Sequence, residues 1–234
     1  MKHKNCYRYP KSQREIINGK RHYDVGREKL PSVTTILSAT QSPEKQASLA
    51  AWRVRVGENE AARIVDNSAT RGTAMHKIIE SYLTGQYHLD LTDVGRNAHT
   101  MAQTIIDKGL ANKITEYYGI EATLYYPDLY AGATDLIAQH IGCDSIIDFK
   151  QTNKPKKKEW IEDYFIQIAA YAMAHDYVYG TQIDKCIIMM CDPNNLYQEF
   201  VIRGYEIKNY KHKFLRRLDE YYNKINKLTG VDKT

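Results

Sequence analysis

Apolar residues follow a helical spacing through much of the first half of the chain. Within residues 43–66, the apolar positions at intervals of three and four are Leu49, Trp52 and Val56, which predicts one helix over this range. A second helix is expected over residues 69–83, ended by Gly85. Residues 31–37 lead into this helical part, and residues 93–118 predict one or two further helices.

A turn signal stands before the helices, in a more polar segment. Asn18 and Gly19 form a pair that favours a two-residue turn between antiparallel strands. We therefore expect a β-hairpin within residues 16–30.

After residue 118, β-branched and aromatic side chains become frequent and apolar positions alternate with polar ones. This pattern predicts a three-strand meander over residues 121–126, 130–139 and 145–151. A long helix is expected over residues 160–179, ended by Gly180. Two further apolar strands are expected over residues 183–191 and 196–202.

The last expected element is a basic amphipathic helix over residues 206–228. Its apolar positions advance in steps of three and four, through Ile207, Tyr210, Phe214, Leu218, Tyr221, Ile225 and Leu228. One face of this helix is expected to pack, with the lysines facing water. The order of helices and strands along the chain indicates an α/β layer arrangement.

The composition is that of a globular chain, with 43% hydrophobic and 26% charged residues in 234. It excludes intrinsic disorder, and no apolar run approaches the roughly 18 residues of a membrane span, so no membrane partner is expected. We expect a single domain, because no repeat or linker interrupts the chain. Its parts are a hairpin region (1–30), a mostly helical region (31–118), a sheet-and-helix region (119–205) and the C-terminal helix (206–228).

The cysteines indicate a reducing compartment. Cys6, Cys143, Cys186 and Cys191 show no CxxC spacing, and the N-terminus does not resemble a secretory signal. Basic residues are frequent within residues 1–21, as is typical of a mitochondrial transit peptide. Pro10 and the Asn-Gly turn, however, oppose the amphipathic helix that such a peptide forms. A cytoplasmic location is therefore favoured over a mitochondrial one.

The 33 basic and 28 acidic residues leave a net charge of +5, which is unevenly spread. Residues 203–228 hold eight basic and three acidic residues, and a second basic cluster is formed by Lys150, Lys154, Lys156, Lys157 and Lys158. Two such clusters favour a polyanionic partner, and the alternative is a pair of solvated faces.

Asp135, Asp148 and Lys150 are the most informative charged residues. Side chains alternate along a strand, so Asp148 and Lys150 share one face while Phe149 points into the core. A tight Ile-Gly turn between the two strands would place Asp135 directly across from Asp148. Carboxylate oxygens bind Mg²⁺ or Mn²⁺, and an adjacent lysine can orient or deprotonate a water or stabilise negative charge. The alternative is a surface salt bridge.

A helical motif adds an imidazole and a carboxylate. Gly72, His76 and Glu80 follow one another at four-residue steps, on one face of a helix. Glu121, at the start of the meander, is either a further carboxylate beside a metal or an exposed strand end. A lone helical histidine is more often structural than a ligand.

Gln167 and Tyr171 repeat the four-residue spacing on the helix over residues 160–179. They offer an amide and a phenol to a phosphate or to a neighbouring strand, although such a pair is also ordinary on a helix surface.

In chain order these motifs read GxxxHxxxE, GxxD, DxK and QxxxY, and they resemble the RecB-like branch of the PD-(D/E)xK nuclease superfamily. The residues concerned are Gly72, His76, Glu80, Gly132, Asp135, Asp148, Lys150, Gln167 and Tyr171. Three further segments are similar to the mitochondrial genome maintenance exonuclease group and its phage relatives, which cut single-stranded DNA from free ends. These segments are residues 31–37, 52–57 and 154–156.

The resemblance implies an α/β fold with a restriction-endonuclease-like core, in which helices flank a mixed central sheet. It adds an N-terminal helical region to the core, and the basic amphipathic helix would follow it. It implies that His76, Asp135, Asp148 and the backbone carbonyl of Phe149 hold Mg²⁺ or Mn²⁺, with Lys150 as the catalytic lysine. Glu80 and Glu121 are further candidate ligands.

The resemblance also suggests a path for DNA. Gln167 and Tyr171 would support the site or touch the strand, and the further candidates for substrate binding are Lys154, Lys156, Trp52, Arg53 and Arg71. Trp52 and Arg53 lie on the early helix, which is a candidate arch over the strand. Some relatives carry an iron–sulfur cluster that uses three cysteines after the core. Only two cysteines, Cys186 and Cys191, follow the core in this sequence, so no iron–sulfur cluster is expected.

We therefore expect a metal-dependent exonuclease that hydrolyses single-stranded DNA from free ends, in replication, recombination or repair, inside a bacterial or phage-infected cell. A structure-specific or duplex endonuclease of the same superfamily is the alternative among enzymes. A catalytically inactive nucleic-acid-binding module is the alternative among binding proteins.

Overall fold

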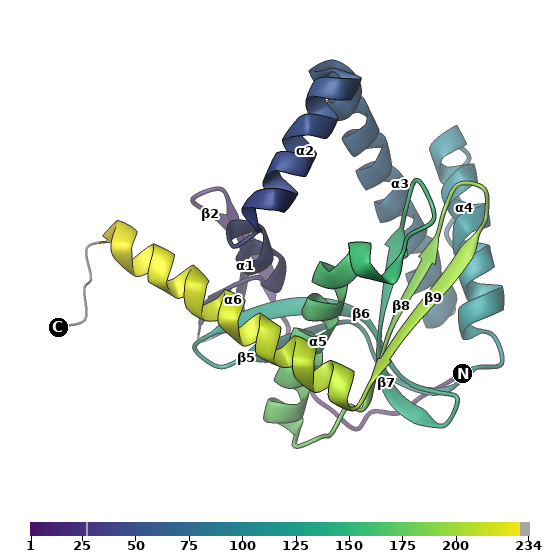
Figure 1. Ribbon diagram of the computed structural model, residues 1–234. Helices are drawn as coiled ribbons and strands as arrows, with labels where there is room; N and C mark the ends of the chain where they lie inside the picture. Colours follow the sequence, from purple (N-terminus) through teal and green to yellow (C-terminus); the bar gives the residue numbers. More distant parts are fainter. Residues whose placement is uncertain (27, 230–234) are drawn as a thin grey trace.

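A six-stranded mixed sheet forms the centre of the molecule in the computed structural model, which describes residues 1–26 and 28–229 (Figure 1). The strands in spatial order are β1 (Lys2–His3), β5 (Ile114–Tyr126), β6 (Tyr130–His140), β7 (Cys143–Gln151), β8 (Lys185–Cys191) and β9 (Tyr197–Arg203). β5, β6 and β7 form the expected antiparallel meander, whereas β7 and β8 are parallel. Parallel neighbours need a crossover, which α5 (Glu162–Tyr179) supplies after a short 3₁₀ turn (Lys158–Ile161).

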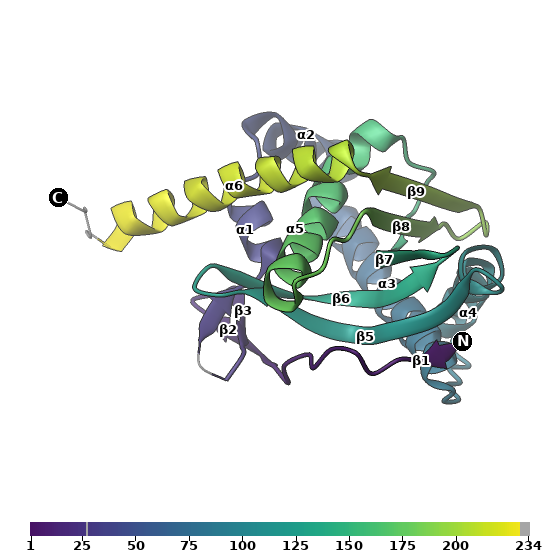
Figure 2. The ribbon, with the colours of Figure 1, turned by 90° about the horizontal axis from the view of Figure 1, so that it is seen from below.

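Helices cover both faces of this sheet, and each face has its own apolar core. α5 packs on one face with α6 (Tyr205–Thr229), and α3 (Glu58–Thr84) and α4 (Asp93–Ile105) lie on the other (Figures 1 and 2). Ile137 and Ile146 belong to the α5 core, while their chain neighbours Leu136 and Ile147 belong to the α3–α4 core. The period-two pattern of the meander therefore reflects burial on both faces.

A second, three-stranded antiparallel sheet precedes the helices. It consists of β2 (Gln13–Ile17), β3 (Lys20–Asp24) and β4 (Lys29–Pro31). Asn18 and Gly19 turn the first hairpin with φ of 51° and 72°, so the expected hairpin is confirmed. A bridge between Ser32 and Ala131 joins this small sheet to β6.

α2 (Pro43–Val56) and α3 rise from the body as the two arms of an arch (Figure 1). The expected break near residues 66–69 is wrong, because the chain turns at Gly57 and α3 then runs without interruption to Thr84. Gly57 has φ of 87°, which favours glycine, whereas nothing at residues 66–69 interrupts a helix. α2 buries none of its residues. A seven-residue helix, α1 (Val33–Ala39), precedes it.

The expectation of helix up to residue 118 is also wrong. α4 ends in a π-helical turn (Ile106–Leu110), and β5 begins at Ile114. Two shifts in the β5–β6 register, on either side of Tyr117, break the alternation of buried and exposed side chains there. Such irregularities hide the period-two pattern from a reading of the sequence.

α6 confirms the expected amphipathic helix, since Ile207, Phe214 and Leu218 are buried. Its cations, however, do not all face water. Lys211 pairs with Asp176 at 2.7 Å, and Arg217 donates to the Leu37 carbonyl at 2.5 Å. Part of the C-terminal basic cluster therefore holds α6 against α5 and α1. No helix in the described part of the chain is both long and apolar enough to cross a membrane.

Candidate active site

β6 and β7 separate where Asp135 and Asp148 lie. The ladder between the two strands begins at the tight turn and stops at the Leu136–Ile147 pair. Beyond that pair β6 stays hydrogen-bonded to β5, while β7 stays with β8. The register is the expected one, so Asp135 and Asp148 are the first residues past the shared ladder. They lie at the base of a fork in the sheet, where β6 and β7 no longer pair with each other.

The fork opens into a cleft of about 400 Å³. Its lining includes Asp135, Asp148, Lys150, His76, Glu80, Glu121, Gln167 and Tyr171, which come from α3, three strands and α5. Tertiary structure thus brings together the predicted site residues of all four motifs.

Asp148 and Lys150 form a tight ion pair, with the side chains 3% and 18% exposed. Burial raises the pKa of Asp148, and the Lys150 charge opposes this rise. Burial lowers the pKa of Lys150, but the Asp148 and Asp135 charges outweigh it, so the net direction is upward. Lys150 is therefore held as an ammonium group beside a carboxylate.

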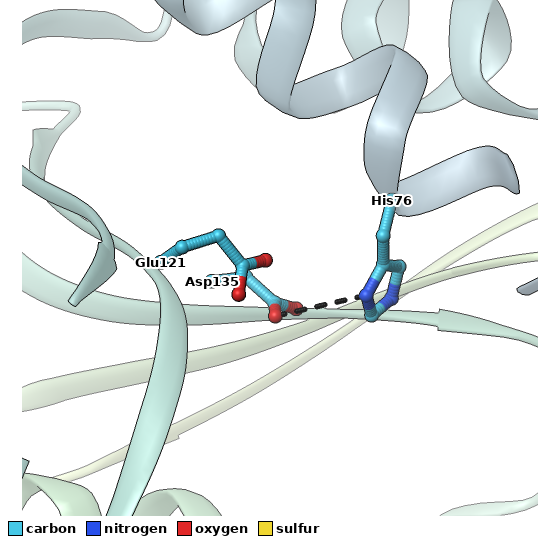
Figure 3. Close-up of side chains that lie close together, drawn as sticks. All are labelled: His76, Glu121 and Asp135. Carbon is cyan, nitrogen blue, oxygen red and sulfur yellow. Dashed lines mark ion pairs between the residues drawn. The ribbon is translucent and has the colours of Figure 1, made fainter. Parts of the chain in front are cut away.

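His76, Asp135 and Glu121 point toward one another from α3, β6 and β5 (Figure 3). One ligand atom from each lies within 4.8 Å of the others. His76 Nε2 lies 2.8 Å from the Phe149 carbonyl oxygen, which can only accept, so Nε2 carries the hydrogen. The lone pair on Nδ1 then lies on the side of Asp135, with 3.8 Å between Nδ1 and Oδ1. The Phe149 N–H donates to Asp135 Oδ2 at 2.6 Å and fixes that carboxylate.

Glu121 has an unusual backbone for its residue type. Its φ is 48°, in the left-handed region that non-glycine residues avoid at a cost of about 1–2 kcal/mol. The Glu121 side chain is 36% exposed, and its partial burial together with the nearby Asp135 charge raises the pKa of Glu121 to about 7. Arg14 lies 3.9 Å away. Strain of this kind concentrates at functional sites, which favours the reading of Glu121 as part of the site over that of a plain strand end.

The other predicted ligand from α3, Glu80, lines the cleft but is engaged elsewhere. Its carboxylate accepts from Lys77 at 3.0 Å and is not part of the three-residue cluster.

Gln167 and Tyr171 are buried rather than on a helix surface. Gln167 Nε2 donates to the Tyr171 hydroxyl at 2.9 Å, and the Tyr171 ring packs against Gly132. A Cβ atom at Gly132 would lie 2.6 Å from that ring. The glycine of the GxxD motif thus makes room for the tyrosine of the QxxxY motif, beside Asp135.

Arg71 holds α3 on the active strand. Its guanidinium donates to Gln151 Oε1 at 2.9 and 3.1 Å and also bonds Asn153. Asn153 in turn donates to Ser68 at 2.8 Å. These contacts, named here the α3 clamp (Arg71, Gln151, Asn153 and Ser68), join the helix that carries His76 to the end of β7.

A second cleft, of about 740 Å³, lies at the arch. Its lining includes the expected substrate-binding residues Trp52, Arg71, Lys154 and Lys156, together with Arg55. Arg53 is exposed on α2 and does not line this cleft.

No sequence motif marks the small N-terminal sheet as part of the site, yet Arg14, Arg21 and Tyr23 line the main cleft. The two-residue turn sets a register that pairs Arg14 with Tyr23 and Ile16 with Arg21. The turn signal therefore predicts that these side chains share one face, but only the tertiary structure shows that this face borders the fork.

The carboxylates, imidazole and lysine at the fork form a cluster suited to a divalent metal, as metal-dependent hydrolases require. The chain is 30% identical over 240 residues to mitochondrial genome maintenance exonuclease 1 of Mus musculus, covering 93% of this chain and 69% of that protein. The Homo sapiens protein of the same name is 27% identical over 207 residues, covering 83% and 59%. The chain belongs to the family of mitochondrial genome maintenance exonuclease 1, which confirms the resemblance and the exonuclease class.

No family model matches the chain. The alkaline exonuclease LHK-Exo from Laribacter hongkongensis aligns with a TM-score of 0.33 and 18% identity, over 68% of this chain and 84% of that one.

Proposed function

We propose that this chain hydrolyses phosphodiester bonds of single-stranded DNA from free ends, with Mg²⁺ or Mn²⁺ as its cofactor and a PD-(D/E)xK core. The observation that carries the proposal is the meeting of Asp135, Asp148, Lys150 and His76 in one cleft at the fork. Membership of an exonuclease family supports it.

The donor set fits a divalent cation. His76, Asp135 and Glu121 offer one imidazole nitrogen and carboxylate oxygens within 4.8 Å, and the Phe149 carbonyl lies beside His76. Asp148 lines the same cleft and is proposed as a further ligand. When bound, the cation would polarise the scissile phosphate and lower the pKa of a water.

The chain's own groups prepare the site for an anionic phosphate. Lys150, kept protonated by Asp148 and Asp135, supplies positive charge where negative charge develops during hydrolysis. The Gln167–Tyr171 hydrogen bond fixes the Tyr171 ring at the cleft wall. The α3 clamp sets the position of His76 over the Phe149 carbonyl.

The arch cleft suits a single strand. Trp52 offers an aromatic face for a base, and Arg55, Lys154 and Lys156 offer cations for phosphates. We propose that a free end reaches the fork by way of this cleft. The roles in replication, recombination or repair, the cytoplasmic location and the absence of an iron–sulfur cluster stay predictions.

A cleavage assay on end-labelled linear and closed circular single strands tests the proposal. Wild type in Mg²⁺ or Mn²⁺ is expected to degrade linear strands only, and EDTA to stop it. Asp148→Asn and Lys150→Gln are expected to lower the rate by at least about a thousandfold, since each removes a group at the reacting phosphate. Asp144→Asn, an exposed change on the same strand, is the matched control.

Circular dichroism on each variant separates lost chemistry from lost fold. Full activity in Lys150→Gln would contradict the assignment of the site. Equal loss of circles would favour the endonuclease alternative, and DNA binding without metal-dependent turnover would favour the inactive binding module.

A further inference from the structure

Arg21 is held rigidly by its backbone. Its carbonyl oxygen accepts two hydrogen bonds, from the Ser32 N–H at 3.0 Å and the Thr35 hydroxyl at 2.9 Å. Ser32 is 2% exposed, and it bridges to Ala131 on β6. The backbone of β3 at Arg21 is thereby tied to the start of α1 and to the strand that carries Asp135.

The Arg21 guanidinium, in contrast, has no hydrogen-bond or ion-pair partner among the residues that the structure describes. Other cleft cations differ in this respect: Arg14 lies 3.9 Å from Glu121, and Lys150 pairs with Asp148. A guanidinium has five donors and prefers a bidentate anionic partner. Arg21 thus presents an unused anion-binding group at the wall of an active-site cleft.

Arg21 also marks the point where the main cleft meets another groove. Arg21 and Thr34 line both the cleft at the fork and a groove of about 470 Å³ between the β2–β3 hairpin and α1. Lys20 and the hydroxyl residues Thr35 and Ser38 also line this groove. It shares no lining residue with the arch cleft. A cation at its entrance, a second cation and a row of hydroxyls are groups that contact a nucleic-acid backbone.

We propose that Arg21 binds a phosphate of the DNA strand next to the scissile one, and that the strand continues from the fork along the hairpin–α1 groove. This inference rests on the proposed function. It assigns the N-terminal sheet a role in holding substrate, because the hydrogen bonds to the Arg21 carbonyl and the bridge to β6 fix the backbone from which the guanidinium extends.

Binding of a labelled single-stranded oligonucleotide to the protein in EDTA tests this inference without turnover. Arg21→Gln is expected to weaken binding about tenfold, the effect of losing one charged hydrogen-bond pair. The slope of log affinity against log salt should become shallower by about 0.7, the value for one phosphate contact on a single strand. Arg21→Lys should retain that slope. Lys29→Gln, which changes a cation of the same small sheet outside the clefts, is the matched control.

A series of oligonucleotides, each with one phosphate replaced by an uncharged methylphosphonate, locates the contact. Wild type should lose affinity at one position next to the cleavage point, and Arg21→Gln should be insensitive to that same position. Arg21→Gln binding like Lys29→Gln, or an equal response of both proteins at every position, would overturn the inference alone. A wild-type protein that neither binds nor cleaves single strands would overturn the proposed function, and this inference with it.

Discussion

At the scale of single residues, the residues of the different sequence motifs contact one another. Gly132 has no side chain because the Tyr171 ring occupies that space, and Tyr171 is kept in place by Gln167. His76 donates to the carbonyl of Phe149, whose own N–H donates to Asp135. The uncharged motif residues therefore help to set the positions of the charged side chains in the cleft.

Gly132→Ala tests the first of these contacts. The added Cβ would lie 2.6 Å from a buried ring, so Tyr171 must move. We expect a loss of about 1–3 kcal/mol in the free energy of unfolding, typical of overpacking, and slower cleavage because Asp135 follows three residues later. Urea denaturation and single-turnover cleavage measure the two effects.

The double variant Gly132→Ala with Tyr171→Leu is the control, because a smaller side chain relieves the crowding. The two changes should then be non-additive. Unchanged stability in Gly132→Ala would show that the contact with Tyr171 is loose.

At the scale of elements, the position of α3 depends on a few polar contacts at its middle. The α3 clamp joins this helix to β7 one turn before His76, and Gly72 allows the close approach, since its Cβ would lie 3.2 Å from Gln151. Arg71 is also a candidate substrate-binding residue. Its contacts with Gln151 and Asn153 indicate a positioning residue.

Arg71→Ala separates these two roles. If Arg71 positions His76, the variant should bind Mn²⁺ about tenfold more weakly, the lower end of the effect of losing a supporting contact behind a ligand. If it only binds DNA, KM should rise while the metal affinity stays constant. Metal titration and steady-state kinetics distinguish the two results. Arg63→Ala, which breaks an exposed pair with Glu60 on the same helix, is the matched control.

At the scale of the whole molecule, two buried histidines link stability to pH. His140 accepts from Lys185 through Nδ1 at 2.7 Å, and His175 contacts Tyr9 at 3.1 Å, where the N-terminal segment packs on α5. Burial lowers the pKa of both imidazoles to about 4, and the Lys185 charge adds to this effect at His140.

The unfolded chain should therefore take up protons first as the pH falls, because its histidines titrate near 6.5. We expect the free energy of unfolding to fall between about pH 6.5 and pH 4, by up to about 1.4 kcal/mol per pH unit for each histidine. Urea denaturation across this range measures the slope. His175→Gln should reduce this slope by the contribution of one bound proton, whereas the exposed His212→Gln should leave the slope unchanged. An unchanged slope in His175→Gln would contradict this account.

The sequence by itself determined the features that depend on neighbouring residues. The Asn-Gly turn at residue 18 and the Ile-Gly turn at residue 141 set two hairpin registers, because few backbone conformations close a two-residue loop. Alternation placed Asp148 and Lys150 on one face with Phe149 on the other. The four-residue spacing of the helical motifs likewise follows from local geometry.

Only the tertiary structure decided where those faces meet. The fork exists because β6 stays paired with β5 while β7 stays paired with β8, after β6 and β7 have separated. Such pairing depends on hydrogen bonds between distant parts of the chain. The same holds for Arg21 beside the fork and for Lys211 and Arg217 in contacts with other elements. Periodicity specifies which side of an element is buried, but the partner that buries it is set by the packing of the whole chain.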